Sequence, residues 1–269
     1  MSNPLDYDHS TDYLPKDCVL KISPSKFSTF IEKPHNWFRQ VILGENQFTY
    51  STSSVLGTVV HYLSEMVAKK QDISKDAIFE YINKHEDNDD YCAQTVIDNF
   101  EQMAGVLINE YVLPNMDNYL EIESRHFVEI LKGFYASGSL DVLEGTKDDC
   151  MVSDYKTYHS KTKPKSIPYY YKYQLLVYAY ILTKLKYKPT RIRLIYVSRN
   201  IEGLMSPTGN GKQLKSYPPE LTVLTEMITD EDMQFITGQL EMCVDACLAT
   251  DEHPELTHVI WHDPRLRGL

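Results

Sequence analysis

Two acidic residues and a lysine stand at the ends of two neighbouring segments that are expected to be strands. Asp141 ends the run GSLD, and Asp154 and Lys156 belong to DYKT, one short turn later. Residues two apart on a strand leave the same face, so Asp154 and Lys156 lie close together, and Asp141 can come alongside. Carboxylates suit a divalent cation, and an ammonium group can offset charge growing on a phosphoryl group. The alternative is an ordinary exposed strand edge, on which a D-x-K tripeptide is common.

A histidine earlier in the chain could extend this group. Gly57 and His61 in LGTVVH are four residues apart, so they share one face of a helix, and the small Gly57 lets another element approach. Imidazole beside carboxylates would broaden the choice of cation from Mg²⁺ toward Mn²⁺. A lone helical histidine can equally be a satisfied core or surface group.

The segment after DYKT combines tyrosines with lysines. Gln174 and Tyr178 are one helical turn apart, and six tyrosines lie between residues 169 and 180. This mixture suits base stacking together with phosphate contact, although an amphipathic core helix could use tyrosine simply for bulk. The candidates for contact with nucleic acid are Lys161, Lys163, Lys165, Tyr170 and Lys172.

The periodicity of the chain changes near residue 118 and predicts the elements that position these residues. Residues 21–118 are expected to be helical, and residues 119–200 to follow the order β-β-β-α-β, with the helix over roughly 167–186. Residues 201–269 are expected to hold a hairpin or loop and then a C-terminal helix. The prediction is a single α/β (α+β) domain over residues 21–269, preceded by a flexible arm over residues 1–20.

The charge distribution indicates an anionic partner. The chain of 269 residues has a formal net charge of −11, which by itself argues against nucleic acid. Residues 155–201, however, contain no acid and carry eight lysines and three arginines, so the remainder of the chain has a charge of −22. Segregation this sharp is unusual for a surface that is merely solvated. This half of the molecule is therefore expected to hold something anionic.

Signals for secretion or membrane insertion are missing from the sequence. The N-terminus has no basic region followed by an apolar one, and the longest apolar run, near residues 175–182, is too short to span a bilayer. Five irregularly spaced cysteines fit reduced thiols better than disulfides, and Cys243 and Cys247 are expected in the core. We expect a cytoplasmic protein with no membrane association.

Five motifs resemble one nuclease family in their order and separations. They are SPSKFSTFIEKPHNWF, LGTVVH, GSLDVL, DYKT and QLLVY, and together they resemble the RecB-type exonuclease branch of the PD-(D/E)xK nuclease superfamily. The resemblance spans roughly residues 22–200. It implies a restriction-endonuclease-like mixed-sheet core, αβββαβ, with an N-terminal helical region and a C-terminal helix. It also implies a deoxyribonuclease that depends on Mg²⁺ or Mn²⁺.

The resemblance assigns roles to individual residues. It implies that Lys156 positions or activates the attacking water, and that Gln174 and Tyr178 orient the lysine or contact DNA. The implied metal ligands are His61, Asp141, Asp154 and the backbone carbonyl of Tyr155.

One departure from the family bears on a second cofactor. Members with an iron–sulfur cluster have cysteine before the N-terminal proline and three more cysteines near the C-terminus, whereas this chain has Lys33 and a tail without cysteine. We therefore expect no iron–sulfur cluster. Packing through Trp37 and Trp261 is expected to hold the N-terminal helix to the C-terminal end instead.

The sequence leaves three functional hypotheses. The first is an exonuclease that acts on DNA ends in recombination or repair, as a stand-alone accessory of the kind that a bacteriophage encodes. The second is a DNA-binding or assembly protein that keeps the fold without catalysis. The third is a nuclease subunit that is active only beside a helicase or a single-strand annealing protein.

Overall fold

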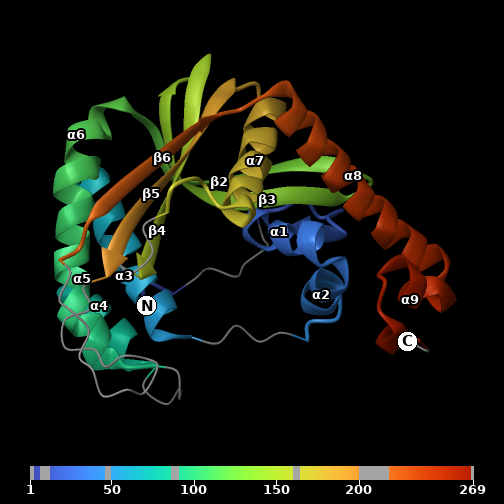
Figure 1. The fold of residues 1–269 in the computed structure, drawn as a ribbon, viewed down its shortest axis with the longest axis horizontal. Helices are drawn as coiled ribbons and strands as arrows, with labels where there is room; N and C mark the ends of the chain where they lie inside the picture. The colour runs from blue at the N-terminus through green and yellow to red at the C-terminus, as the bar shows by residue number, and fades with distance from the viewer. Residues whose placement is uncertain are drawn as a thin grey trace.

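A mixed sheet of six strands lies at the centre of the molecule, with helices on both faces (Figure 1). The computed structural model describes residues 3–6, 13–45, 50–85, 91–159, 164–199 and 218–267. The hairpin or loop expected over 201–217 falls outside the described residues, as do Lys161 and Lys163.

Helices dominate the part of the chain before the meander, as expected. Its elements are β1 (Leu20–Ile22), α1 (Pro24–Glu32), α2 (Pro34–Trp37), a π-helical turn (Phe38–Ile42), α3 (Thr52–Ala68), α4 (Lys75–Asn83), α5 (Ala93–Leu107), a second π-helical turn (Ile108–Val112), α6 (Leu113–Asn115) and a 3-10 turn (Met116–Asn118).

The remaining elements confirm the predicted order β-β-β-α-β and add one strand. They are β2 (Tyr119–Leu131), β3 (Phe134–Thr146), β4 (Asp149–His159), α7 (Tyr169–Lys184), β5 (Pro189–Arg199), β6 (Leu221–Met227), α8 (Asp230–Glu252), a 3-10 turn (Pro254–Leu256), α9 (Thr257–Ile260) and a final 3-10 turn (Pro264–Leu266). The sequence analysis did not predict β6, which pairs antiparallel with β5.

The sheet combines a meander with one parallel crossover. β2 pairs antiparallel along almost the whole length of β3, whereas β4 pairs with only the last part of β3. β1 runs parallel to the beginning of β3. β4 and β5 are parallel neighbours, and α7 supplies the crossover that a parallel pair requires.

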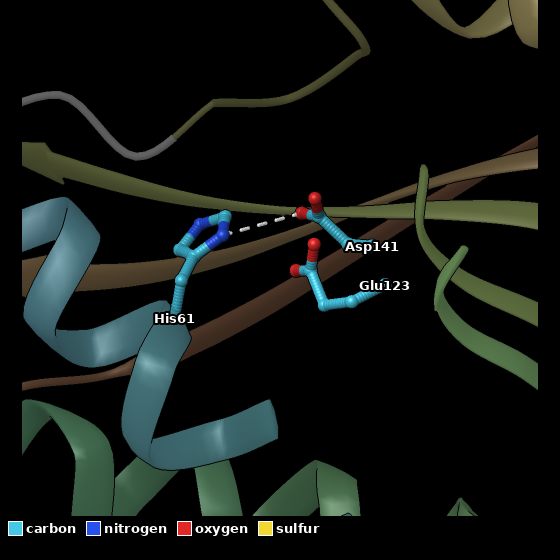
Figure 2. A group of neighbouring side chains, drawn as sticks. All are labelled: His61, Glu123 and Asp141. Carbon is cyan, nitrogen blue, oxygen red and sulfur yellow. Dashed lines mark ion pairs between the residues drawn. The ribbon is translucent and has the colours of Figure 1, made fainter. Parts of the chain in front are cut away.

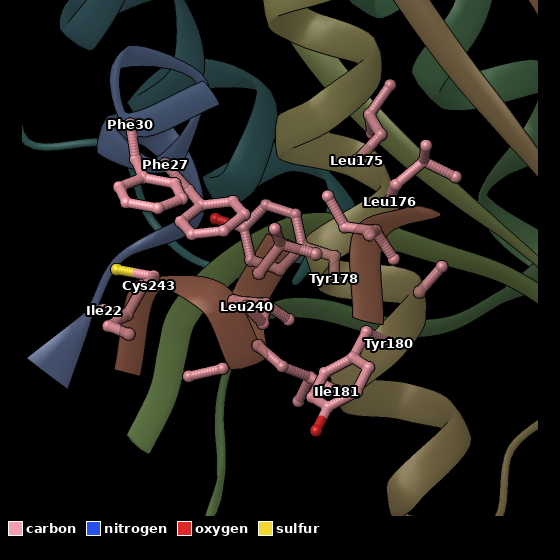
Figure 3. Close-up of a cluster of buried hydrophobic side chains, with 14 of the residues drawn as sticks. Ile22, Phe27, Phe30, Leu175, Leu176, Tyr178, Tyr180, Ile181, Leu240 and Cys243 are labelled. Atoms are coloured by element: carbon pink, nitrogen blue, oxygen red, sulfur yellow. The ribbon is translucent and has the colours of Figure 1, made fainter. Parts of the chain in front are cut away.

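The middle of α7 is buried on every face of the helix. Every residue from Leu175 to Leu182 is buried, and a helix that is apolar all round belongs in a protein interior. Figure 3 shows it packed with side chains of α1, such as Phe27, and of α8, including Leu240 and Cys243. None of the helices in the described ranges has both the length and the apolar character that crossing a membrane requires.

A capping box begins α3, the helix that carries the candidate histidine. The N–H of Ser54 donates to Ser51 Oγ at 3.2 Å, and the N–H of Ser51 donates to Ser54 Oγ at 2.8 Å. Two backbone donors at the helix start are thereby satisfied. Buried residues of α3, including Val55 and Val59, form a second core with α4, α5 and the opposite face of the sheet.

The described residues near the N-terminus contact the rest of the molecule. Leu5 and Leu14 are buried, and Asn3 Nδ2 donates to the carbonyl of Ala77 at 2.8 Å. The described residues of this segment thus have contacts with the rest of the molecule, and the flexible arm over residues 1–20 stays a prediction.

Aromatic packing joins the N-terminal helices to the C-terminal end, as the sequence analysis predicted. The rings of Trp37 and Trp261 stack with centroids 5.8 Å apart, and Phe38 lies 4.6 Å from Trp261. Trp261 Nε1 donates to Thr250 Oγ1 at 2.8 Å, so its polar edge is satisfied.

We predict that Trp261→Ala lowers the free energy of unfolding by about 3 kcal/mol or more, because it leaves a large cavity between the two ends of the chain. Urea denaturation followed by circular dichroism measures the change. Val259→Ala is the matched control, since Val259 is 54% exposed and its truncation leaves no cavity. Equal stability of the two variants would contradict the prediction.

Candidate active site

β3 and β4 stop pairing at the point where the candidate acids lie. Their last pair is Val142 with Ser153, and the earlier part of β3 pairs with β1 instead. Asp141 and Asp154 are the next residues on the two strands, at the fork between them. The N–H of Tyr155, beyond the last pair, donates to Asp141 Oδ2 at 2.7 Å. The fork therefore brings the two acids together and anchors Asp141 on the strand that carries Asp154.

Asp154 and Lys156 form the ion pair expected from their spacing. Asp154 is 3% exposed, and its Oδ1 accepts a hydrogen bond from Gln174 Nε2 at 3.0 Å. Gln174 of α7 therefore orients the carboxylate of Asp154 rather than the amine of Lys156. The hydroxyl of Tyr178, one turn later, donates to the carbonyl of Ser139 and supports β3 beside the fork.

The charges of this pair are set by burial and by each other. Burial raises the pKa of Asp154, an effect that Lys156 opposes and Asp141 reinforces. Burial alone would lower the pKa of Lys156, but Asp154 and Asp141 outweigh it, and the pKa is raised. Lys156 is therefore cationic at neutral pH.

His61 reaches the fork from α3. Its Nε2 lies 2.7 Å from the carbonyl oxygen of Tyr155, and its Nδ1 lies 3.5 Å from Asp141 Oδ2 (Figure 2). A carbonyl oxygen only accepts, so Nε2 carries a proton in this contact, and Nδ1 is the ring nitrogen that faces Asp141. Gly57 lies beside Thr157 of β4, and an added Cβ there would make an ordinary contact at 3.6 Å.

Glu123 is a member of the site that the sequence analysis missed. Ile122 of β2 pairs with Val142 of β3, so Glu123 stands opposite Asp141. Glu123 has a φ of 48°, in the left-handed region that residues other than glycine seldom occupy. Figure 2 shows its carboxylate beside that of Asp141. Backbone strain of this kind is typical of functional sites.

A countable signal for Glu123 was present in the sequence. The turn at Lys132-Gly133 closes the β2–β3 hairpin, and counting back equally from it places Glu123 near Asp141. The left-handed backbone at Glu123 had no comparable signal, because nothing in EIES marks a change in strand geometry.

The pKa of Glu123 is unusually high for a glutamate. Burial raises its pKa to about 9, and Asp141 and Glu65 add to the shift while Lys69 opposes it. The acids around Glu123 thus outweigh the effect of Lys69 on its pKa. Such a position favours either a proton or a bound cation.

The donor atoms at the fork fit a divalent cation. Ligand atoms of His61, Glu123 and Asp141 lie within 4.8 Å of one another. Within the described part of the chain, Asp154 stands apart from this group because Gln174 and Lys156 hold its oxygens. Oxygen ligands with one imidazole suit Mg²⁺ or Mn²⁺.

The candidates for nucleic-acid contact have different surroundings. Lys165 is exposed just before α7, and Tyr170 is 44% exposed on its first turn. Lys172 instead forms ion pairs with Asp232 at 3.0 Å and Glu226 at 3.5 Å.

The sequence profile of one family matches most of the chain. This profile is that of the PD-(D/E)XK nuclease superfamily, and it matches residues 21–250. The chain belongs to this superfamily. The fork residues of this PD-(D/E)XK nuclease, Asp141, Asp154 and Lys156, lie within the matched range.

Solved structures with low sequence identity are similar to this chain. A candidate exonuclease from Eubacterium rectale is 14% identical, with a TM-score of 0.50 over 85% of this chain and 80% of the other. LHK-Exo in complex with dAMP is 12% identical, with a TM-score of 0.40 over 89% and 93% of the two chains. A structure of the alkaline exonuclease LHK-Exo from Laribacter hongkongensis is 11% identical, with a TM-score of 0.34 over 73% and 92%. No curated protein matches the chain.

We predict that Glu123→Gln stabilises the metal-free nuclease. The proton on Glu123 stabilises the folded state below about pH 4.5, and this contribution is lost as the pH rises toward about 9. At pH 8 in EDTA the variant should unfold with a free energy about 1 kcal/mol higher than wild type, and the difference should shrink toward pH 5. Glu110→Gln, at an exposed position, is the control. A constant difference across this pH range would contradict the prediction.

Proposed function

We propose that this nuclease is a divalent-metal-dependent exonuclease that hydrolyses phosphodiester bonds at DNA ends. The observation that carries the proposal is the convergence of Asp141, Asp154 and Lys156 at the fork between β3 and β4. Two carboxylates and an ammonium group at one point suit the transfer of a phosphoryl group to water. The biological setting that we propose is recombination, repair or the processing of phage DNA.

His61, Glu123 and Asp141 would hold the cation, with Asp154 and the Tyr155 carbonyl beside them. Bound there, Mg²⁺ or Mn²⁺ would lower the pKa of a water molecule and offset negative charge on the phosphate. Burial and the fork geometry place these groups before any substrate arrives, so little rearrangement accompanies binding.

Lys156 and Gln174 have different tasks in the proposed reaction. The ammonium group of Lys156 faces Asp154 and would lie beside the phosphate, where its charge stabilises the charge that develops during attack by water. Gln174 holds Asp154 in the orientation that Lys156 requires. Tyr178 is a positioning residue, since its hydroxyl supports the β3 backbone at Ser139.

The basic segment that contains α7 would guide DNA to the fork. Residues 155–201 contain no acid, so phosphates approaching this segment meet only positive side chains of the segment itself. We propose contacts from this group at Lys161, Lys163, Lys165, Tyr170 and Lys172. Ion pairs with Asp232 and Glu226 would have to be exchanged for a phosphate before Lys172 could contribute.

We predict that Asp141→Ala and Lys156→Ala each lower hydrolysis of an end-labelled DNA at least about a thousandfold, because each removes charge that the transition state needs. Asp148→Ala is the matched control, since its side chain is 83% exposed on the turn between β3 and β4. Separate labels at the two ends of linear DNA, with a circular DNA beside it, report the polarity and the need for an end.

Two results would contradict parts of the proposal. Full hydrolysis by both alanine variants would refute the assignment of the site. Cleavage of circular DNA as fast as linear DNA would refute exonucleolytic action. Hydrolysis that begins only when a helicase or an annealing protein is added would identify the chain as a subunit.

We also predict that Mg²⁺ or Mn²⁺ raises the Tm of EDTA-treated protein, because a ligand that binds only the folded state stabilises it. His61→Ala and Glu123→Gln should reduce the shift by removing or neutralising a ligand. His253→Ala, whose side chain is 58% exposed at the end of α8, should keep it. Equal shifts in all three variants would exclude the fork as the binding site.

A further inference from the structure

The first turn of α7 places a wall of tyrosine rings beside Lys156. Lys156 Nζ lies 5.3 Å from the ring centroid of Tyr171. Tyr171 contacts Tyr196 of β5 at 6.0 Å on one side and Tyr170 at 4.1 Å on the other. Tyr158 supports Tyr196 from behind, with centroids 5.3 Å apart.

The exposure of these rings to solvent increases from Tyr196 to Tyr170. Tyr196 is 3% exposed, Tyr171 is half-buried, and Tyr170 is 44% exposed. Tyr170 is also one turn before Gln174, so it shares the helix face whose amide holds Asp154. Its ring is therefore backed by packed aromatic groups while it remains accessible at the edge of the fork.

The two inner rings, Tyr171 and Tyr196, are uncharged at neutral pH. Burial raises the pKa of Tyr171, and the neighbouring Tyr170 reinforces the shift. Burial likewise raises the pKa of Tyr196. A neutral aromatic surface attracts the face of a base without repelling its phosphate.

Only a base that has left the duplex can stack on such a surface. Within a duplex, neighbouring bases cover each base face, and only the edges are open in the grooves. An aromatic ring beside the reacting phosphate can stack on a base that has left the duplex. We propose that Tyr170 stacks on an unpaired base next to the scissile phosphate, so that the enzyme prefers a single-stranded DNA end. This inference rests on the nuclease activity proposed above.

Tyr169 provides a matched control on the same helical turn. It is 73% exposed, more than Tyr170, but it stacks on Tyr173 with centroids 6.3 Å apart. Tyr173 in turn contacts Phe235 of α8 at 5.6 Å. This second aromatic row joins α7 to α8.

The decisive measurement is kcat/KM on a single-stranded oligonucleotide and on a blunt duplex that contains the same strand. Tyr170→Ala should lower the single-strand value about tenfold, as expected for one base stacked on one ring, and lower the duplex value by a clearly smaller factor. Tyr170→Phe should restore the preference, and Tyr169→Ala should keep it. Equal losses on both substrates, or no loss on either, would overturn the proposal.

A binding assay separates this inference from the nuclease activity. A single-stranded oligonucleotide with a terminal 2-aminopurine is titrated with Asp141→Ala protein, with and without Tyr170→Ala. Stacking on Tyr170 should quench the fluorescence, and the second substitution should abolish the quenching. Quenching that depends on Tyr170, together with a wild-type protein that hydrolyses no DNA, would refute the nuclease activity alone. Hydrolysis by the wild type, with quenching that survives Tyr170→Ala, would refute the stacking alone.

Discussion

The loss of pairing between β3 and β4 is the constraint on which the site depends. Backbone groups inside a sheet need partners, and beyond Val142 and Ser153 the two strands no longer supply them to each other. The carboxylate of Asp141 takes the place of a strand carbonyl and accepts the N–H of Tyr155. A structural need of the fold therefore fixes an acid beside Asp154. The crossover between the parallel strands β4 and β5 then places α7 near the same point, and Gln174 of α7 donates to Asp154.

Electrostatic balance at the fork is incomplete within the protein itself. Lys156 offsets Asp154, whereas the nearest partner of Asp141 is the His61 ring, whose Nδ1 lies 3.5 Å from Asp141 Oδ2. Burial raises the pKa of Glu123, and the neighbouring Asp141 and Glu65 add to the shift. A left-handed backbone at Glu123 adds strain to the charge repulsion. The fold thus spends stability at the one place where a cation would restore it.

The sequence predicted those parts of the structure that depend on short-range spacing. Asp154 with Lys156, the α3 helix bearing His61, and the order β-β-β-α-β all follow from periodicity or from motifs. The sequence did not predict the features that depend on tertiary contacts. Glu123 depends on hairpin register and β6 on pairing with β5 across a long connection, while the ion pairs of Lys172 depend on where α8 packs. Composition likewise did not predict the burial of Leu5 and Leu14.

The stacked tryptophans have a consequence for how the chain is made. Arg39 and Asp263, which pair beside them, are 224 residues apart, so this junction closes only after the chain has been synthesised past residue 263. Until then α1 and α2 present uncovered aromatic rings to the cell, and such surfaces attract chaperones or other nascent chains. The fork has its strands long before that moment. The contact of Trp261 with Trp37 therefore affects how the chain folds during synthesis more than it affects the reaction.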